Sequence, residues 1–174
     1  MDVFKAYPGL ARPVHEFAHE LMRGPSRFSE GERECIAAYV SSLNGCDYCR
    51  SSHTGVAERF GIAREVVDAL LRNIETAGIP ERMKPVIRYV TKLNDAPSEI
   101  EEADVRAILD TGWDETAVVH AALICSHFNL MNRWVEGLGI KADSRMVRMA
   151  GVHLHAKGYR GVLDLAGDKP TSGP

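Results

Sequence analysis

The sequence lacks the features that mark several classes of protein. Its apolar stretches are short and interrupted by polar residues, so we expect no membrane-spanning helix. The segment from Met1 to Lys5 has neither the basic nor the apolar part of a secretory signal, and we therefore expect a cytoplasmic protein. With 24 acidic and 21 basic residues, the formal net charge is only −3. That balance provides no basic surface for nucleic acid or for an anionic membrane.

Cysteine is too scarce for the disulfide framework of a small secreted domain. The 174 residues contain four cysteines, at positions Cys35, Cys46, Cys49 and Cys125. A chain of this length buries enough apolar surface to fold without such staples. In a reducing compartment, two cysteines close together in the sequence are more typical of catalysis or metal binding. Cys46 and Cys49 are therefore the first candidates for function, whereas Cys35 and Cys125 lie in apolar runs and are expected to be buried.

Strand-type alternation and internal repeats are also missing, whereas helical periodicity runs through most of the chain. Apolar spacing predicts helices over residues 10–22, 30–43, 46–60, 63–73, 85–93, 98–109, 115–137 and 143–157. Capping boxes are predicted at Ser29-x-x-Glu32 and Ser98-x-x-Glu101, and an N-cap at Asp114. We therefore expect an all-α fold with one helical domain over residues 1–158. A C-terminal tail, residues 159–174, is rich in Gly, Pro, Ser and Asp.

The segment from Glu34 to His53, ECIAAYVSSLNGCDYCRSSH, contains the residues that can carry chemistry. On a helix that starts near Cys46, offsets of three and four residues place Cys46, Cys49 and His53 on one face. The two sulfur atoms can then approach one another, and His53 lies one turn beyond Cys49. Glu34 belongs to the preceding helix, from which it can orient His53 if the two helices pack side by side.

This set of residues suits thiol redox chemistry. The thiolate is the reactive form of cysteine, and a helix N-terminus lowers a thiol pKa through its oriented N–H groups. A thiolate that attacks a peroxide O–O bond becomes a sulfenic acid, and the departing oxygen needs a proton that an imidazole can supply. A neighbouring cysteine can then condense with the sulfenic acid to form a disulfide. The motif thus predicts a redox-active cysteine pair with Glu34 and His53 as a proton relay.

In their E-x11-C-x2-C-x3-H spacing, Glu34, Cys46, Cys49 and His53 resemble the AhpD-like alkylhydroperoxidases of the carboxymuconolactone decarboxylase superfamily. The segments 44–49, 128–133 and 137–140 are similar to its peroxidase-related branch. The resemblance covers roughly residues 10–157. It implies an AhpD-like helical bundle that assembles as trimers or hexamers. It also implies Cys49 as the peroxidatic cysteine, Cys46 as the resolving cysteine, and Glu34 and His53 as the relay.

The chain departs from the better-known alkylhydroperoxidases at Tyr48, where they carry a histidine, so the resemblance does not extend to a relay contribution from that position. The decarboxylases of the superfamily lack the cysteine pair, which disfavours lactone decarboxylation. We therefore predict a thiol-dependent peroxidase that reduces alkyl hydroperoxides without a cofactor or metal and is recycled by an external dithiol. The long apolar helix at 117–130 predicts self-association.

Two alternative functions remain open at this stage. One is a general protein-disulfide oxidoreductase that uses the same cysteine pair. The other is a non-enzymatic binding protein stabilised by zinc, with Cys46, Cys49 and His53 as three ligands and either Glu34 or Cys35 as the fourth.

Overall fold

The structure is a computed structural model that describes residues 6–141 and 143–161. Throughout these residues the chain forms helices and no strand, which confirms the expected all-α class. The α-helices are α2 (Pro8–Arg23), α3 (Glu30–Leu43), α4 (Asp47–Arg59), α5 (Glu65–Arg72), α6 (Lys84–Asp95), α7 (Glu102–Leu109), α8 (Glu115–Gly137) and α9 (Ser144–Lys157). Three short 3₁₀ helices connect some of them, namely η1 (Ile74–Thr76), η2 (Glu81–Met83) and η3 (Pro97–Glu99).

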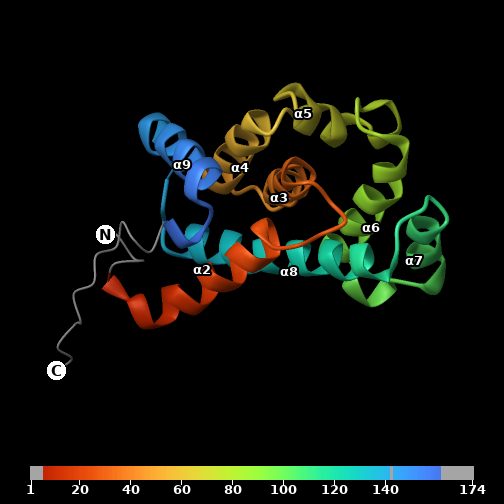
Figure 1. The fold of residues 1–174 in the computed structure, drawn as a ribbon, viewed down its shortest axis with the longest axis horizontal. Coiled ribbons are helices and arrows are strands. Elements are labelled where there is room, and N and C mark those ends of the chain that lie inside the picture. The colour runs from red at the N-terminus through yellow and green to blue at the C-terminus, as the bar shows by residue number, and fades with distance from the viewer. Residues whose placement is uncertain (1–5, 142, 162–174) are drawn as a thin grey trace.

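Helix α3 lies at the centre of the bundle, with α4, α5, α6 and α8 packed around it (Figure 1). Its side chains are buried almost continuously from Arg33 to Ser41, including the charged side chain of Glu34. Helix α9 packs on α4, and α2 packs on α8 and α3. A polar group on α3 is therefore surrounded by other helices and must find its partners among their side chains.

The turn between α3 and α4 reverses the chain and sets the two helices against each other along their length. Gly45 adopts a left-handed conformation with φ 67°, which a glycine reaches without the steric cost of a side chain. The N–H of Cys46 then donates to the carbonyl of Ser41 at 2.9 Å. Because the connection is so short, α4 runs back along α3, and Glu34 near the start of one helix lies opposite His53 in the other.

One predicted capping box is confirmed and the other is wrong. Ser29 accepts a hydrogen bond from the Glu32 N–H, and the Glu32 carboxylate accepts one from the Ser29 N–H. The predicted box at Ser98 and Glu101 does not form, because residues 97–99 make the 3₁₀ helix η3. Helix α7 begins only at 102, with Glu101 as its N-cap and Asp104 as the reciprocal partner. The predicted N-cap Asp114 is confirmed, since its carboxylate accepts from the Ala117 N–H.

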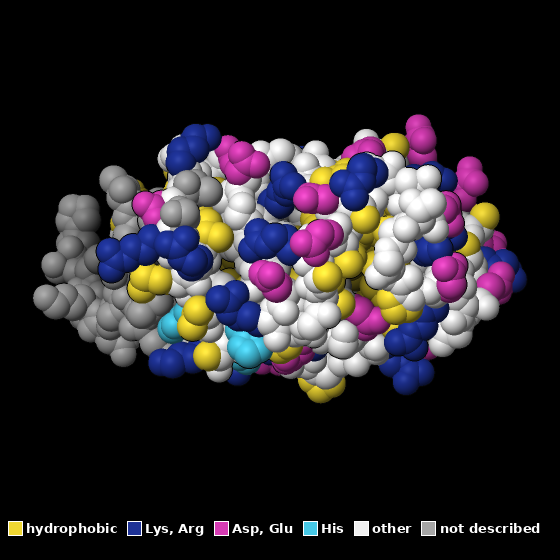
Figure 2. Space-filling view, turned by 90° about the horizontal axis from the view of Figure 1, so that it is seen from above, with side chains coloured by type: hydrophobic (Ala, Val, Ile, Leu, Met, Phe, Trp, Pro, Cys, Tyr) yellow, Lys and Arg dark blue, Asp and Glu magenta, His cyan; other side chains and the backbone are white. Residues whose placement is uncertain are grey.

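Most of the predicted tail, residues 162–174, lies outside the described residues. Its first residues are described, and the side chain of Tyr159 is buried in the core. On the face shown in Figure 2, acidic and basic side chains are interspersed, with apolar side chains between them. None of the helices formed by residues 6–141 and 143–161 has the length and apolar character that a membrane crossing requires.

Candidate redox site

Glu34 and His53 meet in the core as a hydrogen-bonded pair. The distance between His53 Nδ1 and Glu34 Oε2 is 2.7 Å, and Glu34 is fully buried. An ionised carboxylate can only accept hydrogen bonds, so the imidazole donates from Nδ1. In the neutral ring Nε2 is then unprotonated and free to take up a proton. The pairing that the sequence predicts across the two helices is therefore present.

The second carboxylate oxygen of Glu34 has two further partners that the sequence motif does not include. Arg23 Nη2 lies 2.7 Å from Glu34 Oε1, and the Tyr159 hydroxyl donates to the same oxygen at 3.0 Å. The Tyr159 oxygen also lies 3.3 Å from His53 Nδ1, and its ring stacks on the imidazole with 6.1 Å between centroids. Glu34 and His53 thus belong to a four-residue cluster drawn from α2, α3, α4 and the segment after α9.

The protonation states within this cluster follow from its contacts. Burial acts to raise the pKa of the Glu34 carboxyl, but the contacts with His53 and Arg23 outweigh it and hold the pKa below its ordinary value. Burial, together with the adjacent Glu34 charge, raises the pKa of the Tyr159 hydroxyl well above its ordinary value. Glu34 is therefore an anion at neutral pH, and Tyr159 is a neutral donor.

Arg23 is held in place by groups from three parts of the chain. Its guanidinium donates to the carbonyls of Met22 at 2.8 Å and Leu154 at 3.1 Å. It also lies over the rings of Phe60 and Tyr159, at 5.1 and 5.3 Å from their centroids. Through these contacts Arg23 links α2, the end of α4 and α9. Its positive charge lies beside the Glu34 carboxylate.

Cys46 and Cys49 lie at the start of α4 as free, buried thiols that pack against Val135 of α8. Cys46 is the N-cap residue, and Cys49 is in the first turn. The two side chains lie in one buried cluster and act on each other's ionisation. The two cysteines are thus brought together as the motif predicts.

The two sulfurs are unequal in their affinity for a proton. The hydrogen bonds from Cys49 lower the pKa of Cys46, although burial opposes this effect. The hydrogen bond to Cys46 and burial both raise the pKa of Cys49 above its ordinary value. The lowering effect of the helix N-terminus therefore acts on Cys46 and not on Cys49. Because the two thiols act on each other, the pair loses its protons in two steps, and the second proton is held more tightly than the first.

The cysteine pair and the relay are neighbours but form separate hydrogen-bonded groups. Cys49 is close enough to Tyr159 to raise the pKa of that hydroxyl, and the His53 ring packs edge-on against Phe128 at 4.5 Å between centroids. Among the hydrogen bonds of the described residues, none joins His53 to either cysteine. A small molecule that takes a proton from His53 during attack by a sulfur atom would have to lie between the two groups.

The zinc alternative requires a convergence of ligands that the described residues do not show. Within residues 6–141 and 143–161, no three side chains of His, Cys, Asp or Glu are grouped so that they could hold a metal ion. His53 directs Nδ1 to Glu34, and the two cysteines pack with Val135 in a separate buried cluster. A structural zinc site would need four ligands around one point.

We expect mild oxidation to join Cys46 to Cys49 and to leave the other two cysteines free. Burial raises the pKa of Cys35 to about 12 and that of Cys125 to about 11, so neither presents a thiolate at neutral pH. Peptide mapping under non-reducing conditions after treatment with one equivalent of peroxide measures the pairing. A dominant bridge that involves Cys35 or Cys125 would contradict this expectation.

Comparisons with known proteins give a family and a set of structural relatives. Residues 8–90 match the model of the carboxymuconolactone decarboxylase family. An uncharacterized peroxidase-related protein from Silicibacter sp. TM1040 is 27% identical with a TM-score of 0.75, over 83% of this chain and 77% of that chain. An uncharacterized peroxidase-related protein with an alkylhydroperoxidase AhpD core, from Ralstonia eutropha JMP134, is 26% identical with a TM-score of 0.78, over 86% and 78% of the two chains.

The fold is also found in a debrominase. The debrominase Bmp8, in complex with 2,3,4-tribromopyrrole, is 19% identical with a TM-score of 0.58, over 93% of this chain and 75% of that chain. No protein with a curated function matches the chain in sequence. The AhpD-like resemblance that the sequence motif indicates is confirmed by the family match and by the peroxidase-related structures.

Proposed function

We propose that this chain, whose residues 8–90 match the model of the carboxymuconolactone decarboxylase family, is a thiol-dependent peroxidase that reduces alkyl hydroperoxides. The proposal is carried by one observation: the buried Glu34–His53 pair lies beside two buried cysteines that pack together at the start of a helix. Reduction of a peroxide needs a thiolate and a nearby proton donor for the departing oxygen. Both are placed together in this core.

The proposed cycle has three balanced steps. A thiolate attacks the terminal oxygen of ROOH, so that an S–O bond forms, the O–O bond breaks, and the RO⁻ group leaves as ROH after taking a proton through His53. The second cysteine attacks the sulfur of the sulfenic acid, which releases water and forms the Cys46–Cys49 disulfide. An external dithiol then reduces this disulfide by thiol–disulfide exchange. The peroxide is reduced and the dithiol is oxidised, and no cofactor takes part.

We assign the attack to Cys49 and the resolving step to Cys46. Cys49 is the cysteine that acts electrostatically on Tyr159, and it therefore lies toward the relay. Cys46 is the N-cap of α4, where fraying of the helix end gives it freedom to move. Both cysteines pack in one buried cluster, so Cys46 lies within reach of an oxidised Cys49.

Turnover of an alkyl hydroperoxide with a small dithiol as reductant tests the proposal. The wild-type protein should consume peroxide, and Cys46→Ser and Cys49→Ser should each lose turnover. After one equivalent of peroxide, Cys46→Ser should carry a sulfenic acid at Cys49 that dimedone traps, whereas Cys49→Ser should carry none at Cys46 on the same timescale. Mass spectrometry reads the label.

The matched control is Cys125→Ser, which changes a buried cysteine away from the pair and should retain turnover. Absence of peroxide consumption by the wild-type protein with every dithiol supplied would reject the peroxidase function. Equal labelling of the two single variants would reject only the division of roles between the cysteines.

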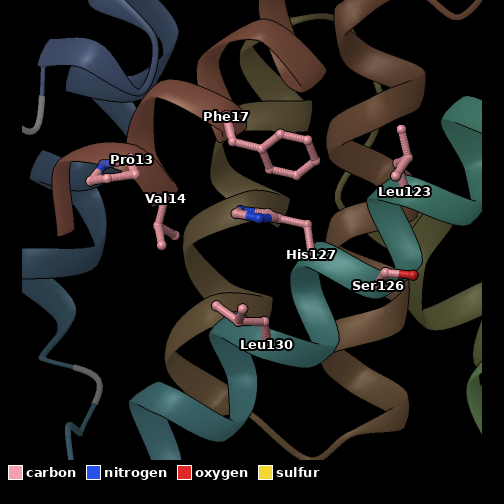
Figure 3. Close-up of a pocket in the computed structure, with 7 residues that line it drawn as sticks. All are labelled: Pro13, Val14, Phe17, Leu123, Ser126, His127 and Leu130. Atoms are coloured by element: carbon pink, nitrogen blue, oxygen red, sulfur yellow. The ribbon is translucent and has the colours of Figure 1, made fainter. Parts of the chain in front are cut away.

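We further propose that the chain forms a homo-oligomer, a trimer or hexamer as the family resemblance implies, through the outer face of α2 and α8. A groove of about 340 Å³ lies between these helices, lined by Pro13, Val14, Phe17, Leu123, Ser126, His127 and Leu130. Figure 3 shows the His127 ring between Phe17 and Leu130. Burial lowers the pKa of His127 to about 4, so that this ring is neutral and suits an apolar contact.

Large apolar side chains protrude around the groove. Leu10 on α2 and Val119 on α8 are exposed to 68% and 53%, and Leu130 to 49%. A monomer rarely leaves such side chains together in water, because their burial against another surface is favourable. The outer face of α2 and α8 thus has both a groove and projecting apolar side chains. When two copies meet through this face, the side chains of one copy can fill the groove of the other.

Leu123→Glu/Leu130→Glu should convert the oligomer into a monomer, because the interface would then bury two unpaired carboxylates. Light scattering coupled to size-exclusion chromatography gives the mass. Leu71→Glu, which changes an exposed leucine on α5, is the control and should leave the mass unchanged. A monomer mass for the wild-type protein at micromolar concentration would show that this face has no role in self-association.

A further inference from the structure

The hydroxyl group of Ser52 is buried in helix α4 without a hydrogen-bond partner. Ser52 is only 3% exposed, and its Oγ is one of four buried side-chain atoms of the described residues that make no hydrogen bond. A buried hydroxyl that loses its hydrogen bonds to water and gains none destabilises a fold, so such groups are rare in native proteins. The contacts within the folded chain thus give this hydroxyl no role.

Other serines in the helices of this protein satisfy their hydroxyl groups locally. Ser42 Oγ donates to the carbonyl of Ala38 at 2.8 Å, and Ser126 Oγ donates to that of Ala122 at 2.9 Å, in each case four residues earlier. Ser52 lies within α4, where a carbonyl is available at the same offset, yet its hydroxyl makes no such bond. The hydroxyl of Ser52 is therefore turned away from the backbone of its own helix.

Ser52 shares the buried side of α4 with two residues of the redox site. Cys49 lies three residues before Ser52, His53 follows it directly, and all three side chains are buried. Side chains three and four positions apart are neighbours on a helix, so the hydroxyl and the imidazole both lie next to the Cys49 side chain. They are roughly 4.5–6 Å further along the helix axis than Cys49. A small molecule bound at the Cys49 sulfur would therefore meet Ser52 and His53 together.

Attack on a hydroperoxide requires a hydrogen-bond donor at this place. When the Cys49 sulfur attacks the terminal oxygen, the O–O bond breaks and negative charge develops on the departing oxygen, which is one bond further from the sulfur. His53 is proposed to supply the proton that this oxygen finally takes. A hydroxyl can donate a hydrogen bond to the same oxygen while its charge is developing. The Ser52 hydroxyl gives up no existing hydrogen bond when it does so.

We propose that Ser52 is a further catalytic residue, whose hydroxyl donates a hydrogen bond to the departing oxygen of the hydroperoxide during attack by Cys49. The inference rests on the proposed function, since it requires that Cys49 attacks a peroxide. The departing oxygen carries more charge in the transition state than in the bound peroxide, so the hydrogen bond becomes stronger as the O–O bond breaks. Ser52 should therefore accelerate the chemical step.

The rate of sulfenic acid formation with two oxidants tests this role. In the Cys46→Ser background, Ser52→Ala should slow the oxidation of Cys49 by cumene hydroperoxide about 10- to 100-fold, the usual effect of a hydrogen bond to a charged group. Oxidation by peracetic acid should stay near the parent rate, because the departing acetate is a weak base that needs little stabilisation. Rapid mixing, dimedone trapping and mass spectrometry measure both rates.

Ser51→Ala is the matched control, because it changes the neighbouring, half-buried serine of the same helix, and it should leave both rates unchanged. If Ser52→Ala reacts with cumene hydroperoxide at the parent rate, or loses the same factor with both oxidants, the catalytic role of Ser52 is wrong. A parent protein whose Cys49 is not oxidised by cumene hydroperoxide would reject the proposed function itself, and this inference with it. The two failures are distinguishable because one appears in the parent and the other only in the comparison with Ser52→Ala.

Unfolding by denaturant tests whether the Ser52 hydroxyl is unpartnered, and it needs no peroxide. Ser52→Ala removes a buried group that gains no hydrogen bond in the fold, so the variant should unfold at an equal or higher denaturant concentration than the parent. Alanine also favours a helix more than serine does, and Ser51→Ala measures that gain separately. A lower denaturant concentration at half-unfolding for Ser52→Ala would show that the hydroxyl is hydrogen-bonded within the fold, and would overturn the proposal.

Discussion

Replacement of His53 by glutamine should slow the oxidation of Cys49 by roughly 10²–10⁴-fold, the usual contribution of a positioned proton donor. Glutamine can still donate a hydrogen bond to Glu34 Oε2, so the buried carboxylate keeps both Arg23 and a neutral donor. It cannot carry a proton to the departing alkoxide. The rate of sulfenic acid formation in the Cys46→Ser background, followed by rapid mixing with an alkyl hydroperoxide, measures the effect.

His155→Gln is the matched control, because His155 is an exposed histidine of α9 that does not contact Glu34. It should oxidise at the parent rate. The circular dichroism of His53→Gln should match that of the parent protein, since Arg23 remains beside the Glu34 carboxylate. An unchanged oxidation rate in His53→Gln would mean that the proton reaches the departing oxygen by another path, and the relay assignment would be wrong.

Arg23→Leu should lower the free energy of unfolding by about 3 kcal/mol, as is usual when one member of a buried ion pair is removed. Glu34 is fully buried, and the side chain of Arg23 is only 8% exposed, so water cannot replace the lost charge. Denaturant unfolding at neutral pH measures the difference. Arg23→Leu/Glu34→Gln should recover part of the loss, because no uncompensated carboxylate then remains.

The cost of Arg23→Leu should also depend on pH in a defined direction. The pKa of Glu34 is lowered in the folded protein, so its charge stabilises the fold above the unfolded value near 4.5. This contribution is lost as the pH falls through the lowered folded value. The free energy of unfolding lost in Arg23→Leu should therefore be largest at neutral pH and smaller in acid. Arg27→Leu removes an exposed partner of Asp114 and should cost no more than about 1 kcal/mol at any pH.

The fold class and the pairing of Glu34 with His53 follow from local features of the sequence. Helical periodicity and the Ser29 capping box fix the start of α3, and Asn44-Gly45 marks the turn after it. Because that turn is short, α4 runs back along α3, and the separation of 19 residues places His53 opposite Glu34. The start of α7 could not be predicted in the same way, because the sequence offers two overlapping capping boxes, at residues 98–101 and 101–104. Pro97 begins the 3₁₀ helix η3, and α7 then starts from the second box.

The rest of the site could not be read from the sequence because it depends on long-range packing. Arg23 reaches Glu34 from the end of α2, and Tyr159 reaches it from the segment after α9, 125 residues further along the chain. Neither residue belongs to the motif, so only the packing of these segments reveals its contact with Glu34.

The position of Tyr159 has a consequence for biosynthesis. Its hydroxyl bonds to a carboxylate that precedes it by 125 residues, and the carbonyl of Leu154 helps to hold Arg23. During translation the helices α2 to α8 leave the ribosome before either partner exists, and domains generally fold as units as they emerge. A nascent chain that already contains both cysteines therefore lacks two of the groups that hold the Glu34 cluster. The cluster is completed only when α9 and Tyr159 dock on the helices made before them.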